Sequence, residues 1–199
     1  MPKIVDHEER RRLLARAVVE VADRRGLENA SLRAVAQHAG MSMGAVQHYF
    51  DDREAMLEFV LDYTQQQRTA RIQQAVRALP VPSPHAMLTA MVDEILTVDE
   101  TNQTFERVNS MFVDRARRHP ATAERLGQGR AEVIRLLTGL LQCHQGDPAL
   151  AAEILWALLE SLPTAITLGQ HTIDSARDVA HTYLSTITRE TPDDPSPTR

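Results

Sequence analysis

Apolar residues recur at helical spacing along most of the chain, and the pattern is clearest near its start. A first helix is predicted over residues 6–25 and is ended by Gly26, because glycine is common just past a helix. One face of this helix is apolar and carries Leu13, Leu14, Ala17, Val18, Val21 and Ala22. The opposite face carries Arg10, Arg11, Arg12 and Arg16. The single apolar face predicts that other helices pack against it.

Two shorter helices follow and are joined by a tight turn. Ser31 is suited to cap the first, over 32–39, because its hydroxyl can accept from the free N–H groups at a helix start. Gly40 ends this helix, since glycine readily takes a positive φ, and Ser42 caps the next one. Isolated helices under about 12 residues are marginal in water, so both need the longer helix as cover. Residues 1–55 are therefore predicted to form a three-helix unit whose last helix enters the DNA major groove.

Six further helical patterns follow, without a β pattern or an internal repeat. The first begins after Asp52 and continues to about Leu79, where Pro80, Pro82 and Pro84 enforce a break. Three others begin at Ser83 or span about 101–118 and 120–142. Asp147 and Pro148 open the next, over 150–168, and Thr172 caps the last, over 172–189. We therefore expect an all-α fold.

Composition favours a globular protein of the cytoplasm. The 199 residues are 43% hydrophobic, which is enough to bury a sizeable core. We see no apolar run near 18 residues and no leader-like pattern, so neither a membrane-spanning nor a secreted protein is expected. The single cysteine, Cys143, excludes an internal disulfide, and its place in an apolar stretch favours a small buried side chain.

The net charge of −5 at first argues against a nucleic-acid partner. Residues 1–55, however, carry nine basic and nine acidic side chains, so the acidity lies in the remainder of the chain. A neutral unit attracts DNA weakly. We therefore expect it to rely on the placement of its charges and on doubling of the site in a dimer.

The stretch SLRAVAQHAGMSMGAVQHYFDDREAML, which begins at Ser31, resembles the helix-turn-helix of the TetR family of bacterial transcriptional regulators. The similarity covers residues 10–60 without a gap. It implies a homodimer that binds a palindromic operator on double-stranded DNA, most often as a repressor, in the cytoplasm at the nucleoid. It also implies release by a small, mainly apolar effector.

The implied organisation has two domains. A three-helix DNA-binding domain is expected over residues 1–55, followed by a helical effector-binding and dimerisation domain over 56–190. The end of the chain, 191–199, has no apolar content and is expected to be a disordered tail.

The resemblance implies ten DNA-contacting residues: Ser31, Arg33, Ser42, Met43, Gly44, Ala45, Gln47, His48, Tyr49 and Arg53. In the major groove, Arg33 can pair with guanine and Gln47 with adenine, and Gln47 stands where the family most often has a tyrosine. The hydroxyl of Tyr49 is expected at a phosphate. Arg53 replaces a lysine that binds phosphate in the family.

Two carboxylates, Asp51 and Asp52, precede Arg53 and would oppose DNA binding unless they face the protein. Asp51 with Glu54 three residues on fits a capping box, which would turn one carboxylate inward. Phe50 is expected in the core. The arginines of the first helix are either a solvated face or include a phosphate contact.

Candidate pocket residues in the second domain are mostly methionines and aromatic side chains, which suit adaptable apolar cavities. They are Met87, Met91, Phe105, Asn109, Phe112 and Trp156. Core packing is the simpler explanation for any one of them. Asn109 is polar within an apolar stripe and could orient a ligand or satisfy a backbone group.

The last two helices carry more apolar surface than one core requires, which predicts a four-helix bundle with a second copy. The residues predicted at this dimer interface are Ile154, Leu158, Leu162, Ala165, Ile166, Ala176, Val179, Ala180, Tyr183 and Ile187. Pro163 lies inside the first of these helices and would kink or split it by removing a backbone hydrogen bond.

No catalytic residue, metal site or cofactor is predicted. The eight histidines lack H-x-x-x-H and E-x-x-H spacing, and adjacent acids such as Asp93 and Glu94 point to different helix faces. Two alternatives stay open. One is a helical enzyme or small-molecule carrier that keeps the helix-turn-helix as a scaffold, and the other is a regulator controlled by protein partners.

Overall fold

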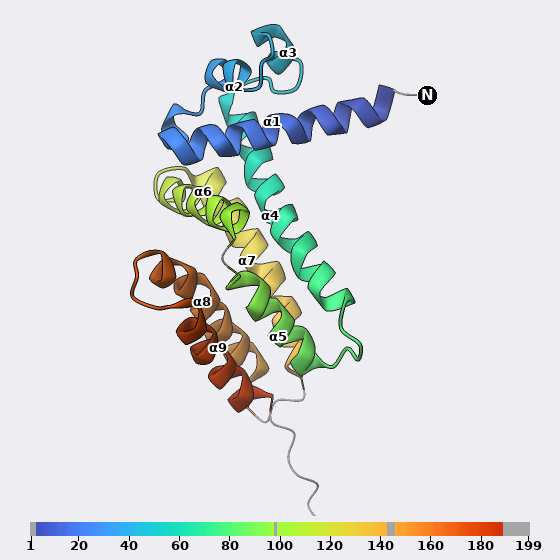
Figure 1. The fold of residues 1–199 in the computed structure, drawn as a ribbon, viewed down its shortest axis with the longest axis vertical. Helices are drawn as coiled ribbons and strands as arrows, with labels where there is room; N and C mark the ends of the chain where they lie inside the picture. The colour runs from blue at the N-terminus through green and yellow to red at the C-terminus, as the bar shows by residue number, and fades with distance from the viewer. Residues whose placement is uncertain (1–2, 98, 143–145, 189–199) are drawn as a thin grey trace, which may run out of the picture. The chain divides into compact units, whose positions relative to one another are not determined.

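The computed structural model describes residues 3–97, 99–142 and 146–188, and within these ranges every regular element is helical (Figure 1). The elements are α1 (Lys3–Arg25), a 3-10 helix η1 (Leu27–Asn29), α2 (Leu32–His38), α3 (Met43–Gln47), α4 (Arg53–Arg77), α5 (Pro84–Ile95), α6 (Glu100–Ala116), α7 (Pro120–Leu140), α8 (Pro148–Thr167) and α9 (Ile173–Ile187). The expected all-α fold is confirmed. The predicted tail and Cys143 lie outside the described residues.

The described residues form two compact units. The first unit consists of the residues up to Ala70 together with 99–127. The second consists of 71–97, 128–142 and 146–188. By this division α6 packs with the N-terminal helices, whereas the sequence places a functional boundary near residue 55. That boundary stays a prediction.

The first unit is built around α1, which packs against η1, α2 and α6. The buried face of α1 is wide: Ala15 and Val19 lie in the core beside Leu14 and Val18. The predicted core position of Leu13 is wrong. This side chain is exposed, because the buried face of α1 is centred further round the helix than the pattern indicated.

The start of α4 also belongs to the first unit, and the predicted capping box of Asp51 and Glu54 is wrong. Oδ1 of Asp52 accepts a hydrogen bond from the backbone N of Ala55 at 2.8 Å, and α4 begins at Arg53. The helix therefore starts one residue later than that capping box requires. The Glu54 carboxylate is available for partners outside its own helix.

In the second unit α5, α8 and α9 pack on one another. Leu137 of α7 and Leu141, which directly follows α7, add to their core. Three predicted helix starts are confirmed, because Ser83, Asp147 and Thr172 each accept a hydrogen bond from a backbone N–H of the helix that follows. These caps satisfy N–H groups that would otherwise lack partners at a helix start.

α8 runs without interruption across Pro163, so the helix is not split there. By length and composition alone, α8 could cross a membrane, which corrects the expectation that no apolar run near 18 residues occurs. Its only charged residues are Glu153 and Glu160. Six of its side chains are buried in the second unit, and helices in protein cores pass the same test of length and composition.

Candidate DNA-binding site

Gly40 and Met41 cap the end of α2 and begin the turn that leads to α3. Gly40 has a φ of 64°, and the backbone N of Met41 donates to the carbonyl of Ala36 at 2.9 Å. The N of Gly40 also donates to the carbonyl of Gln37 at 3.4 Å. This is the hydrogen-bond pattern of a Schellman motif, which requires a residue that tolerates the left-handed region. The turn therefore fixes where the next helix starts.

Serine caps hold the starts of both short helices. The hydroxyl of Ser31 accepts from the N of Ala34 at 3.1 Å, and that of Ser42 accepts from the N of Ala45 at 3.2 Å. Both serines are thus occupied by backbone groups of their own helices. Their neighbouring N–H groups remain at the helix starts, where partial positive charge suits a phosphate.

α3 buries one side and exposes the other. Val46 is fully buried in the core of the first unit, and Phe50 just beyond the helix is buried with it, as expected. The exposed side carries Met43, Gly44, Gln47 and His48. Ala45 and Tyr49 are half-buried, and the rings of His48 and Tyr49 meet edge-on at 5.4 Å between centroids. Six of the ten predicted DNA contacts, from Met43 to Tyr49, thus lie on or beside α3.

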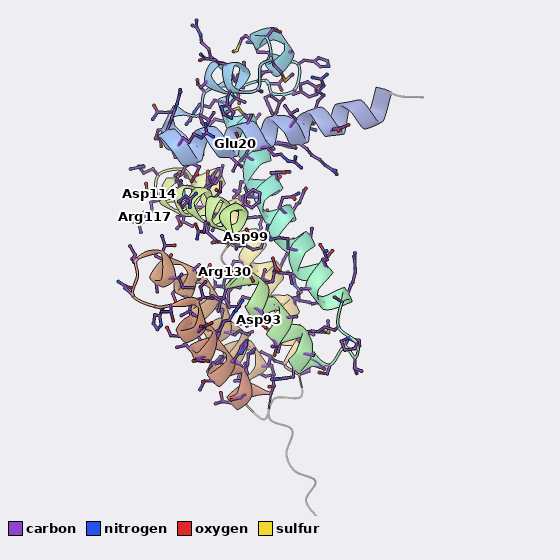
Figure 2. All side chains as sticks on the ribbon, viewed as in Figure 1. Glu20, Asp93, Asp99, Asp114, Arg117 and Arg130 are labelled. Carbon is purple, nitrogen blue, oxygen red and sulfur yellow. The ribbon has the colours of Figure 1, made fainter. Side chains whose placement is uncertain are left out.

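α2 is held against α1 by a polar contact that the sequence pattern did not reveal. Glu20 of α1, labelled in Figure 2, has Oε2 2.6 Å from Nε2 of His38. Arg33 lies on α2 with its side chain exposed. The contact partners are 18 positions apart in the chain, so only the tertiary structure brings them together.

Arg53 does not extend into solvent as a simple phosphate contact would. Its Nε donates to the carbonyl of Ala30 at 3.1 Å, and its Nη2 donates to the carbonyl of Leu27 at 2.8 Å. Two acidic residues, Glu28 and Glu54, lie 3.7 and 3.5 Å from its Nη atoms. The guanidinium is therefore engaged with the chain segment that leads into α2.

Two arginines of α1, Arg11 and Arg16, contact aromatic side chains of α4, which the sequence pattern did not predict. The Arg11 guanidinium lies over the ring of Phe59, 4.6 Å from its centroid. Nε of Arg16 donates to the Tyr63 hydroxyl at 3.3 Å. These contacts attach α1 to α4 through cations that the sequence pattern assigned only to a solvated face or to phosphate.

The predicted pocket residues fall into two groups. Phe105 and Phe112 belong to the core of the first unit, with Asn109 half-buried on the same helix. Met91 and Trp156 lie in the core of the second unit. Met87, on the same helix as Met91, is half-buried. The structure therefore brings together residues within each group.

Trp156 differs from ordinary core side chains in one respect. Its indole Nε1 is buried and has no hydrogen-bond partner. The great majority of buried hydrogen-bond donors in proteins have an acceptor, because burying a donor without one costs free energy.

Four of the ten predicted interface residues lie in the core of their own unit: Leu162, Ala176, Ala180 and Ile187. Ile154 and Val179 are exposed, at 42% and 38% of their surface. The remaining four are half-buried: Leu158, Ala165, Ile166 and Tyr183. The Tyr183 hydroxyl donates to the carbonyl of Ala151 at 3.1 Å, and burial raises the pKa of this tyrosine. The apolar surface that a second copy could cover is thus narrower than the predicted set.

Among the residues that the structure describes, no three His, Cys, Asp or Glu side chains are grouped so as to hold a metal ion. Three acidic residues of the first unit, Glu20, Glu28 and Glu54, each contact a histidine or an arginine. The chemistry of this region is therefore that of hydrogen-bond donors and acceptors on short helices.

Comparison with known families agrees with this geometry. Residues 14–60 match the family described as bacterial regulatory proteins, tetR family. Residues 84–189 match the BetI-type transcriptional repressor, C-terminal family. The chain is 35% identical to the HTH-type transcriptional regulator PksA of Bacillus subtilis, over 81% of the chain and 80% of PksA. It is 30% identical to the HTH-type transcriptional regulator BetI of Pseudomonas aeruginosa, over 92% and 95% of the two chains.

Solved structures share the fold. A transcriptional regulator from Rhodococcus sp. RHA1 superposes with a TM-score of 0.78 at 27% identity, covering 89% of this chain and 95% of its own. A regulator from Saccharomonospora viridis, solved in complex with choline, has a TM-score of 0.78 at 16% identity and covers 89% and 96%. With its helix-turn-helix and these regulator relatives, the chain belongs to the TetR family of bacterial regulatory proteins and is a transcriptional regulator, not an enzyme.

Proposed function

We propose that this regulator is a dimeric repressor in the cytoplasm that reads a palindromic operator through α3 and releases it when a small ligand binds. The exposed side of α3 carries the proposal. Met43 and Gln47, the first and last residues of this short helix, are both exposed, and its other side lies in the core. Two copies with recognition helices about 34 Å apart would read two half-sites one helical turn apart.

The DNA-reading step is tested by selecting bound duplexes from a random library with the wild-type protein. Arg33→Ala and Gln47→Ala are then titrated on the selected palindrome and on a scrambled duplex of equal length. Each loss of a base contact is expected to weaken palindrome binding about tenfold. Scrambled binding should stay unchanged in Gln47→Ala, which conserves charge, and should fall only about threefold in Arg33→Ala, which removes one positive charge per subunit. Gln66→Ala, at an exposed position of α4, is the control. Recovery of random sequences, with no palindrome enriched, would reject the proposal.

For the dimer we propose one stripe of α8 with the adjoining edge of α9. Leu150 and Ile154 on α8 and Leu168, the cap residue directly after it, are exposed large apolar residues at helical spacing, and Val179 is exposed on α9. Exposed apolar residues aligned on one surface are a common mark of an interface. A second copy would cover this apolar stripe, and the resulting dimer would supply one recognition helix for each half-site of a palindrome.

Charge placed in that stripe should separate the subunits. Ile154→Glu and Val179→Glu are expected to give a monomer in light scattering and to lose binding to the selected palindrome. Leu136→Glu, at an exposed apolar position of α7, is the matched control. A dimer that survives both stripe variants but not Leu136→Glu would place the interface on α7 instead.

For the effector we propose a small ligand with an apolar body and one acceptor atom, bound in the second unit beside Trp156. The buried, unpaired indole Nε1 supports this, because a ligand acceptor would satisfy it. Met91 lies in the same core and can adapt to a ligand. Such a ligand releases DNA only as far as it binds the low-affinity conformer better.

Choline is a suitable first probe, since a structural neighbour was solved with it. We expect choline to weaken palindrome binding, and tetramethylammonium, which lacks the hydroxyl acceptor, to act more weakly. Trp156→Phe removes the N–H and should make the two compounds equivalent. Unchanged discrimination in Trp156→Phe would exclude the indole from the effector site.

A further inference from the structure

We propose that Arg53 is a positioning residue that fixes the entrance to α2, and that it does so in place of the phosphate contact made by a lysine in related regulators. The proposal rests on DNA reading by the helix-turn-helix. It concerns how that unit is held in shape. Glu54 and Arg115 complete the arrangement by anchoring Arg53 from α6.

The two carbonyl acceptors of Arg53 lie at the two ends of η1. Leu27 opens η1 and Ala30 follows its last residue, and both side chains are buried. Ala30 directly precedes Ser31, the cap of α2. Because one guanidinium binds both carbonyls, at 2.8 and 3.1 Å, it sets the path of the chain immediately before α2.

Glu54, which lies beside Arg53, is also bound by a buried arginine of α6. Arg115 of α6 is only 3% exposed, and its Nη2 donates to Oε2 of Glu54. The second carboxylate oxygen, Oε1, lies 3.5 Å from Nη1 of Arg53. Glu54 therefore stands between two arginines, one from α6 and one from the first turn of α4. A buried charge needs such a partner, so the arrangement resists rearrangement.

The planar fork of arginine is what this geometry uses. Nε and Nη2 of Arg53 donate to carbonyls that belong to residues three positions apart. Lysine keeps the positive charge but has a single ammonium on a flexible stem. Arg53→Lys therefore separates the two roles: it preserves a phosphate contact and loses the fork that spans the two carbonyls.

The first measurement needs no DNA. Hydrogen exchange of the backbone amides from Asn29 to Ala34 is followed in the wild type, Arg53→Lys and Arg53→Gln. Positioning predicts that both variants exchange about tenfold faster in this segment, while α5 and α9 are unchanged. Arg117→Lys, which replaces an exposed arginine just after α6 (Figure 2), is expected to exchange like the wild type. Wild-type exchange in Arg53→Lys would overturn the proposal.

The second measurement uses the palindrome selected by the wild type and a scrambled duplex, each over a salt series. A lost phosphate contact in each subunit would lower the slope of log affinity against log salt by about 1.8 in a dimer. Positioning predicts an unchanged slope, with palindrome affinity reduced at least fivefold in Arg53→Lys and scrambled affinity retained. A reduced slope in Arg53→Gln that Arg53→Lys restores would assign Arg53 to phosphate instead.

The anchoring by α6 is tested with the double variant Glu54→Gln, Arg115→Met, which removes both charges together. Faster exchange from Asn29 to Ala34, by at least threefold, is expected, because Arg53 loses its carboxylate. Unchanged exchange would remove Glu54 and Arg115 from the proposal. Failure of the wild type to select any palindrome would reject the DNA-reading function but would leave the exchange results to decide the role of Arg53.

Discussion

At the scale of single residues, Gly40 determines how α2 passes into α3. Its φ of 64° lies in the left-handed region, where residues with a side chain are strained. A Cβ built at Gly40 has no neighbour within 4 Å, and the same holds at Gly44 in α3. The two glycines therefore differ in backbone conformation and not in available space.

This difference predicts opposite effects on stability. Gly40→Ala should lower the free energy of unfolding by about 1 kcal/mol, because alanine must adopt the left-handed conformation. Gly44→Ala should raise it by about 0.5 kcal/mol, since glycine inside a helix is less favourable than alanine. Urea unfolding followed by circular dichroism measures both. Equal shifts in the same direction would contradict the assignment of strain to Gly40.

Residue-level predictions from sequence were accurate where the cause is local. Ser31, Ser42 and Gly40 were identified because a cap or a positive φ depends on neighbours three or four positions away. The orientation of Arg53 was not predictable in this way. Its two acceptors lie 23 and 26 positions earlier, so only the folded chain brings them within reach.

At the scale of helices, α1 and α6 are joined by a fork of Arg107 around the Asp23 carboxylate. Nε of Arg107 donates to Oδ1 of Asp23 at 2.5 Å and its Nη2 donates to Oδ2 at 2.9 Å. The guanidinium holds the pKa of Asp23 below its ordinary value of 3.8. A paired carboxylate of this kind links helix packing to pH.

The sign of that link follows from the lowered pKa. Asp23 stabilises the fold fully above pH 3.8, and this contribution is lost as the pH falls through the lower pKa of the folded state. Asp23→Asn should therefore lose less stability than the wild type between about pH 5 and pH 3, as measured by urea midpoints. Asp114→Asn, in an exposed pair with Arg118, is the control. Parallel losses in wild type and Asp23→Asn would show that the fork has no effect.

The pattern of helices was predicted well because amphipathic spacing and caps depend only on residues within or next to each helix. Ser83 before Pro84, and Asp147 before Pro148, each mark a helix start that the structure confirms. η1 was missed, since a single turn of three residues leaves no periodicity. Packing partners were also missed, because an apolar face does not identify the helix that covers it.

At the scale of the whole molecule, charge is divided unevenly along the chain. The first 55 residues are neutral and the rest carry the net charge of −5. Asp51 is exposed and Asp52 caps α4, so both carboxylates lie in the segment that follows α3. Non-specific affinity for DNA should accordingly be limited by a few identifiable groups.

Removing one of those carboxylates should strengthen non-specific binding. Asp51→Asn is expected to raise affinity for a scrambled duplex about threefold at low salt, because it removes one repulsive charge per subunit. Glu132→Gln makes the same charge change at an exposed position of α7 and should have little effect. An equal gain from both variants would indicate that only net charge matters.

The candidate pocket and the candidate interface both stay predictions, and the structure gives their residues different surroundings. The candidate pocket combined Phe105 and Phe112 with Met91 and Trp156, yet these pairs lie in the cores of different units. The candidate interface mixed exposed Ile154 with buried Ala180. Hydrophobicity alone does not separate the face that fills a core from the face left for a partner.

Trp156 gives the molecule a built-in optical reporter. It is the only tryptophan in the sequence and is buried in the core of the second unit, so its emission follows that unit. Circular dichroism, by contrast, follows the helices of both units. If the units unfold one after the other, the two signals will change at different denaturant concentrations, and coincident curves will indicate one cooperative transition. The order in which the two units lose structure can therefore be measured on the unlabelled protein.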